Sequence, residues 1–226
     1  MRACEYPVPT LYGDVDTPPE PSMPKRYSRP SRMTSHGYEF ECSGESSYPP
    51  YRSFASDGHL DVYLSTDFVE AAAYDDLCHE LRQMGESDTV TMYINSEGGD
   101  MTGGTALILA MRDSPATIKT VLHPFAMSMA TLVFLSGDEY EVPTFGQLML
   151  HHYSGGMEGK GPELLAEATA AVGWFECFFR EICDGFLTEL EIHEVLRGRD
   201  LWLQADDILQ RLEQLEHRAD AEVRAA

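Results

Sequence analysis

The sequence is poor in basic residues. It contains 16 lysines and arginines against 38 aspartates and glutamates, which gives a formal net charge of −22. Phosphate-rich partners are recognised by clusters of basic side chains, so this balance argues against nucleic acid and against an anionic membrane surface as partners. The charge does not identify a substrate, and an acidic soluble protein is the simplest interpretation.

Paired cysteines and long apolar runs are also missing. The five cysteines are an odd number and include no Cys-x-x-Cys spacing, so neither a zinc site nor a disulfide framework is predicted, and no motif requires a metal or cofactor. No stretch approaches the roughly 18 apolar residues of a membrane helix. Residues 1–10 lack the apolar run of a signal peptide. We therefore expect a reducing, cytoplasmic location.

Regular structure is not expected at the N-terminus, where nine of the 13 prolines fall within residues 1–50. Proline fixes φ and removes a backbone donor, which disfavours both helix and sheet. We predict that residues 1–58 form an extended or disordered arm. Residues 59–210 are expected to form the globular domain, and residues 211–226 an acidic helical tail.

Apolar periodicity begins near residue 59 and alternates between strand and helix patterns. This alternation indicates an α/β domain with a largely parallel sheet. The expected strands are 60–66, 89–95 and 117–123, with two short strands within 140–153. The expected helices are 67–85, 102–113, 128–137 and 163–190, followed by a charged helix near the C-terminus.

Two turns in this pattern could carry chemistry. Gly98 and Gly99 follow a buried strand, and glycine lets backbone N–H groups face an anion. Ser128 begins a predicted helix, where unpaired N–H groups and the helix dipole favour negative charge. A serine there could attack a carbonyl while the N–H of Met129 binds the developing oxyanion. Each feature has an ordinary alternative, a tight turn for the glycines and an N-cap for Ser128.

Two further residues are candidates for acid–base work. His151 closes an apolar strand, so it could be a base aimed at the end of the sheet or an ordinary core histidine. Asp200 lies between a helix and the apolar run Leu201 to Leu203. It could hold an imidazole in the required tautomer, or it could form a surface ion pair with Arg199.

Taken together, these elements resemble the Clp protease proteolytic-subunit family, as a divergent member. Four segments resemble the family motifs YINSPGG, ASMG, VMIHQP and RDRFLSAEEA, in the family's order. They are YINSEGG (93–99), AMSMA (126–130), QLMLHHY (147–153) and RDLWLQADD (199–207). The 30 residues from Gly98 to Ser128 and the 49 from His151 to Asp200 match the family spacing, whereas the 23 from Ser128 to His151 are slightly fewer.

The resemblance, which covers residues 59–210, implies roles for individual residues. Ser128 would be the nucleophile, His151 the general base and Asp200 the residue that orients the base. The backbone N–H groups of Gly99 and Met129 would form the oxyanion hole. His151 occupies the histidine place of the family motif, and its neighbour takes a position that glutamine usually holds.

The resemblance also implies a fold and an assembly. The fold would be a spiral of strand-strand-helix units, shared with crotonases, with an extended handle helix after Pro162. The chain would form heptameric rings, single or stacked in pairs, with residues 154–161 pairing between rings. The chamber would degrade unfolded polypeptides by serine endopeptidase chemistry without a cofactor, and an ATP-driven unfoldase is a possible partner. The alternatives are a non-catalytic ring or scaffold subunit and a crotonase-type acyl-CoA enzyme.

Overall fold

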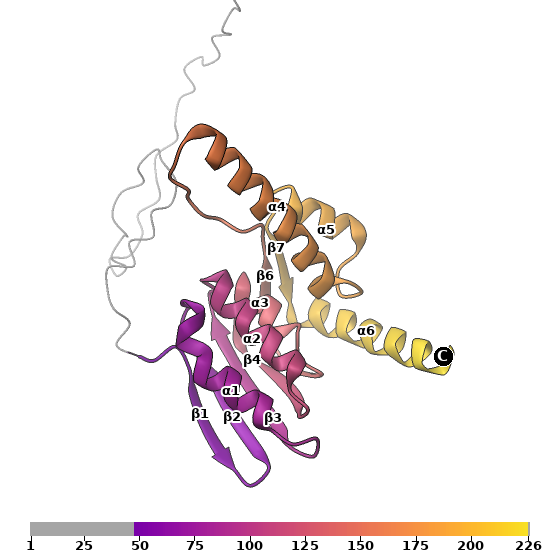
Figure 1. The fold of residues 1–226 in the computed structure, drawn as a ribbon. Helices are drawn as coiled ribbons and strands as arrows, with labels where there is room; N and C mark the ends of the chain where they lie inside the picture. The colour runs from indigo at the N-terminus through magenta and orange to yellow at the C-terminus, as the bar shows by residue number, and fades with distance from the viewer. Residues whose placement is uncertain (1–47, 226) are drawn as a thin grey trace, which may run out of the picture. The chain divides into compact units, whose positions relative to one another are not determined.

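The computed structural model describes residues 48–225, with side chains up to residue 218. This part of the chain forms one seven-stranded sheet with six α-helices and one short 3-10 helix (Figure 1). The strands are β1 (Arg52–Ser56), β2 (His59–Leu64), β3 (Thr89–Ser96), β4 (Thr117–Met127), β5 (Glu139–Glu141), β6 (Gln147–Leu150) and β7 (Leu201–Gln204). The helices are η1 (Ala71–Tyr74), α1 (Asp75–Gln83), α2 (Met101–Asp113), α3 (Met129–Phe134), α4 (Gly161–Cys183), α5 (Glu189–Leu196) and α6 (Ala205–Ala225).

The sheet is mixed, with a parallel centre. The strand order is β1-β2-β3-β4-β6-β7, and β5 pairs with β4 beside this path. Strands β2, β3, β4 and β6 are parallel neighbours, whereas β1 and β7 join the two ends antiparallel. This arrangement confirms the predicted α/β class.

Alternating burial explains why the central strands form. In β2 the side chains of Leu60, Val62 and Leu64 are buried, and the residues between them are only partly covered. Strand β3 follows the same alternation in register, except that Thr91 is buried as well, so both strands present one apolar face. Helices α1 and α2 lie over the sheet in Figure 1, and their buried side chains join those of the strands in one core cluster.

Helix α2 packs closely against the first residue of α3. Its N-cap is Asp100, whose carboxylate accepts hydrogen bonds from the N–H groups of Thr102 at 2.7 Å and Gly103 at 3.1 Å. A Cβ on Gly104 would lie 2.3 Å from the Met129 side chain. The absence of a side chain at this position therefore lets α2 contact the residue that follows Ser128.

The N-terminal boundary differs from the sequence prediction. Residues Arg52–Ser56 lie inside the predicted arm, yet they form β1 and pair antiparallel with β2. Tyr51 also stacks on Tyr74, with ring centroids 6.1 Å apart. The sheet therefore begins before residue 59, and residues 1–47 of the predicted arm lie outside the described residues.

The predicted long helix over 163–190 is wrong beyond Cys183. Helix α4 ends there, and Gly185 follows with φ +81°. A new helix, α5, then begins at a capping box formed by Thr188 and Glu191. Most of α4 before Phe175 is exposed, as expected of a helix that extends from the body of the domain.

Of the helices in residues 48–225, none has the length and apolar character to cross a membrane.

Candidate functional site

Ser128 occupies a strained turn between β4 and α3. Its φ is +52°, and it is the only non-glycine residue in 48–225 with a positive φ. Its N–H donates a hydrogen bond of 2.8 Å to the Met149 carbonyl, which holds the turn against β6. Such strain at a strand-to-helix turn is typical of serine nucleophiles, because the sharp turn exposes the hydroxyl.

The hydroxyl of Ser128 does not cap the helix that it precedes. Ser128 stands at the N-cap position of α3, but its side chain makes no capping hydrogen bond. Its Oγ lies instead 2.7 Å from Nε2 of His151. The alternative that Ser128 serves only as an N-cap is therefore wrong, because its hydroxyl contacts His151 and not the helix backbone.

The pairing of β4 with β6 accounts for the contact between Ser128 and His151. The last pair of this parallel ladder is Met127 with Met149, so both strands end at the same edge of the sheet. Ser128 follows one strand directly, and His151 follows Leu150 at the end of the other. Residues that are 23 positions apart in sequence thus meet within hydrogen-bond distance.

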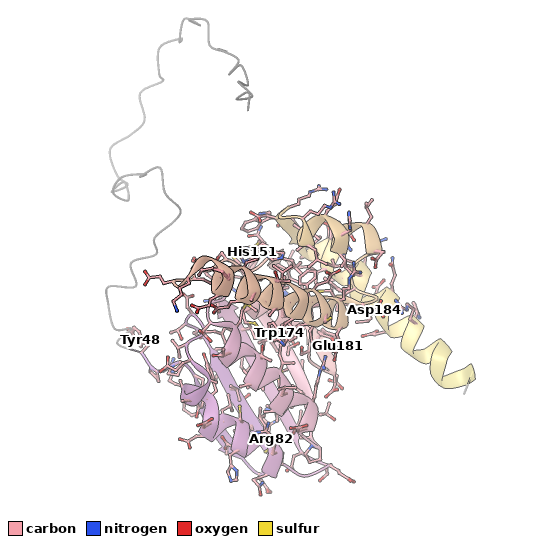
Figure 2. All side chains as sticks on the ribbon, turned by 45° about the horizontal axis from the view of Figure 1, so that its top comes forward. Tyr48, Arg82, His151, Trp174, Glu181 and Asp184 are labelled. Carbon is pink, nitrogen blue, oxygen red and sulfur yellow. The ribbon has the colours of Figure 1, made fainter. Side chains whose placement is uncertain are left out.

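His151, labelled in Figure 2, and its neighbour have different surroundings. The ring of His152 packs against Tyr153 and against Phe175 of α4, with centroid distances of 4.7 and 4.9 Å. The structure therefore brings His151, and not His152, to the Ser128 hydroxyl.

Burial lowers the pKa of His151 below its ordinary value of 6.5, because a half-buried imidazolium loses solvation. The charge of Asp200 acts in the opposite direction and raises this pKa, and His152 lowers it further. Burial is the largest of these effects. The imidazole is therefore neutral at pH 7 and can accept a proton from the Ser128 hydroxyl.

Asp200 lies beside His151 without bonding to it. In the antiparallel pair of β6 and β7, Leu150 is opposite Leu201, so the next residues outward are His151 and Asp200. The strand register alone brings the two together. However, Asp200 is exposed, and within residues 48–225 no hydrogen bond joins it to His151.

The glycine turn is held in place by backbone hydrogen bonds to Phe68. Phe68 forms an isolated parallel bridge with Gly99, in which the Phe68 N–H donates to the Gly98 carbonyl at 2.6 Å and the Phe68 carbonyl accepts from Asp100 at 2.8 Å. Because extended backbone alternates its polar groups, the N–H of Gly99 points away from Phe68.

Gly98 lies directly against the serine turn. A Cβ at this position would be 2.6 Å from the Cβ of Ser128 and 3.2 Å from the backbone nitrogen of Met129. In the described part of the chain, the N–H groups of Gly99 and Met129 have no hydrogen-bond acceptor. The glycine turn therefore approaches the backbone that carries Ser128 and Met129, and both donors remain without a partner there.

Sequence reasoning missed two buried hydroxyl groups at this site. Ser96 Oγ accepts a hydrogen bond of 3.1 Å from the Gly98 N–H and so holds the glycine turn. Thr131 lies under the serine turn and contacts both strands that carry the site. Ser96 lies within the motif segment 93–99 but was assigned no role, and no sequence pattern marks Thr131, because both hydroxyls act on the backbone. Residues 48–225 contain no group of three or more acidic, histidine or cysteine side chains that could hold a metal ion.

The fold and this site define an α/β protein with a serine–imidazole pair at the carboxyl ends of parallel strands. Residues 44–211 match the model of the Clp protease family, which is well over half of the chain. The chain therefore belongs to the Clp protease family, as the sequence motifs predicted.

Curated relatives are similar to this chain at low identity. An ATP-dependent Clp protease proteolytic subunit of Deinococcus radiodurans is 28% identical over 55% of this chain and 62% of its own length. Subunit 2 of Thermobifida fusca is 29% identical over 54% of this chain and 61% of its own length. The ATP-dependent Clp protease proteolytic subunit of Pleurastrum terricola is 34% identical over 38% of this chain and 45% of its own length. The chain thus spans about half to three fifths of the length of these relatives.

Proposed function

We propose that this protein is a serine endopeptidase in which Ser128 is the nucleophile and His151 the general base. The observation that carries the proposal is the distance of 2.7 Å between the Ser128 hydroxyl and Nε2 of His151. Membership of the Clp protease family supports peptide-bond hydrolysis as the reaction.

The chemistry follows from the positions of these groups. Ser128 Oγ attacks the carbonyl carbon of the scissile peptide bond, and its proton passes to Nε2 of His151. The negative charge that forms on the carbonyl oxygen accepts hydrogen bonds from the Gly99 and Met129 N–H groups. The imidazolium then gives its proton to the leaving amine, and water hydrolyses the acyl-enzyme by the same route in reverse. Asp200 stabilises the imidazolium through its charge. To orient the ring, as the family motif implies, its carboxylate would have to move into hydrogen-bond contact with Nδ1 of His151.

The proposal includes an assembly and its partners. The subunit would form heptameric rings, single or doubled, that enclose the active sites and admit unfolded polypeptide. Residues 154–161 would pair between stacked rings, and α4 would be the handle between them. The names of the curated relatives include ATP dependence, which supports an ATP-driven unfoldase as a partner. A cytoplasmic location is part of the proposal, with Cys78, Cys177 and Cys183, which form no disulfide within the described residues, remaining thiols.

Labelling with an alkyl fluorophosphonate tests the catalytic part of the proposal. The probe should attach to Ser128, as located by mass spectrometry. Ser128→Ala should abolish labelling and His151→Ala should strongly reduce it. Two matched controls should keep it: His152→Ala, and Ser136→Ala, whose hydroxyl only bonds the Leu132 carbonyl.

A folded oligomer that is not labelled would contradict the proposal and favour the alternative of a non-catalytic ring or scaffold subunit. The mass of the native assembly tests the ring stoichiometry separately. Degradation of a permanently unfolded protein, compared with its folded counterpart, tests the substrate class.

A further inference from the structure

The side chain of Thr131 lies completely buried beneath the serine turn. Thr131 is the third residue of α3 and has 0% of its surface exposed. Its Oγ1 lies 2.8 Å from the Ala126 carbonyl oxygen and 2.8 Å from the Met149 carbonyl oxygen. A hydroxyl has one proton to donate, so the two carbonyls share it or receive it in turn.

These two carbonyls have matching positions in the site. Ala126 precedes Ser128 by two residues near the end of β4, and Met149 precedes His151 by two residues near the end of β6. One hydroxyl therefore contacts both strands just before each delivers its functional side chain.

The paired residues of β4 and β6 end just before the site. Pairing of β4 with β6 ends at Met127 and Met149. Past that pair, the Met149 carbonyl accepts from the Ser128 N–H at 2.8 Å and from the Thr131 hydroxyl at 2.8 Å. The Thr131 N–H also donates to the Ser128 carbonyl at 3.1 Å. Thr131 thus contacts the backbone on both sides of the serine as well as the strand of the histidine.

We propose that Thr131 is a positioning residue that sets the distance between Ser128 and His151 through its hydroxyl. This inference rests on the proposed function. Proton transfer from Ser128 requires its oxygen to remain within hydrogen-bond reach of Nε2, and small displacements of such a pair lower the rate steeply. Thr131 is fully buried and touches no substrate, so it should affect the rate at which Ser128 attacks and not the binding of substrate.

Thr120 offers a matched control in the same core. It is also 0% exposed, and its Oγ1 lies 2.9 Å from the Phe134 carbonyl and 3.4 Å from the Glu139 carbonyl. This hydroxyl joins β4 to the far end of α3 and to β5, away from the serine. Its loss should cost stability without changing the site.

The experiment measures the rate constant for labelling of Ser128 by an alkyl fluorophosphonate, together with the unfolding midpoint. Thr131→Val removes the hydroxyl and keeps the shape, and it should slow labelling by about tenfold. Thr131→Ser keeps the hydroxyl and should restore the rate to within about twofold of the original chain. Thr120→Val should lower the unfolding midpoint and leave the labelling rate unchanged. If Thr131→Val does not fold, Thr131→Ala takes its place in the comparison with Thr131→Ser.

Several results would overturn the role of Thr131. One is an unchanged labelling rate in the variant that lacks the hydroxyl. Another is an equal loss of rate in Thr120→Val, which would indicate general destabilisation. A third is failure of Thr131→Ser to restore the rate, which would assign the effect to packing. The absence of labelling in the unmodified chain would overturn the proposed function itself, and the role of Thr131 with it.

Discussion

Leu150 and Leu201 are direct partners across the antiparallel pair of β6 and β7. One step outward from this pair, the strands carry His151 and Asp200. His151 and Asp200 are therefore neighbours because of the backbone register of β6 and β7. Asp200 nevertheless remains exposed and forms no hydrogen bond to His151 within the described residues. Its influence on the imidazole is through charge.

The role of Asp200 can be tested by removing its charge. Asp200→Asn should leave folding and assembly intact, because the side chain is exposed. Peptide turnover should fall, but by less than the roughly 10⁴-fold of a comparable triad whose aspartate is buried and bonded to the imidazole, because Asp200 acts through its charge alone. Steady-state hydrolysis of a fluorogenic peptide measures this effect. Asp206 is another exposed acid close by in sequence, so the control substitution Asp206→Asn should not change turnover. Unchanged turnover in Asp200→Asn would remove Asp200 from the mechanism.

The pH dependence of activity should reflect the lowered pKa of His151. A general base works in its neutral form, so activity rises as the pH increases through this pKa. Because burial lowers the pKa, the acidic limb of kcat/KM should lie below pH 6.5. The charge of Asp200 raises this pKa, so Asp200→Asn should move the limb to still lower pH in its residual activity. A limb above pH 6.5, or a shift to higher pH in the variant, would contradict this electrostatic account.

Gly98 should not accept a side chain. Its φ is +108°, which side-chain-bearing residues rarely adopt, and a Cβ would lie 2.6 Å from that of Ser128. Gly98→Ala should therefore displace the serine turn and abolish fluorophosphonate labelling. Gly173→Ala is the matched control, because a Cβ there meets nothing within 4 Å. Normal labelling of Gly98→Ala would show that the serine turn does not depend on this close approach.

The ion pair between Glu191 and Arg211 should stabilise the junction of α5 and α6. Arg211 Nη2 lies 2.7 Å from Glu191 Oε1, and both side chains are 21% exposed. The hydrogen bond from Arg211 is the main reason why the pKa of Glu191 falls to about 2. Glu191→Gln, which can still complete the capping box with Thr188, should lower the free energy of unfolding by about 1–2 kcal/mol at pH 7.

The sign of the pH effect on this pair follows from the lowered pKa. The charged form is favoured in the folded chain, so its contribution is complete above the ordinary pKa of 4.5 and is lost as the pH falls towards about 2. Denaturant unfolding should show a constant difference between the original chain and Glu191→Gln from pH 7 to pH 5. A difference that shrinks within that range would indicate that another group is responsible.

The sequence alone determined the class of the fold and named the candidate residues of the site. Alternating burial in β2 and β3 follows from apolar periodicity, which is a local property of the chain. Ser128, His151 and the Gly98–Gly99 turn were recognisable because each stands where a strand ends and because their order matches that of the family motifs, although the spacing from Ser128 to His151 is slightly shorter.

Only the tertiary structure decided how these residues meet. The contact of Ser128 with His151 depends on the register of β4 and β6, and the place of Asp200 depends on β7, which the sequence did not predict as a strand. The break after α4 depends on one glycine with φ +81° and a new helix cap. Thr131 bonds two backbone carbonyls, and because every residue carries a carbonyl, no side-chain pattern could have indicated those partners.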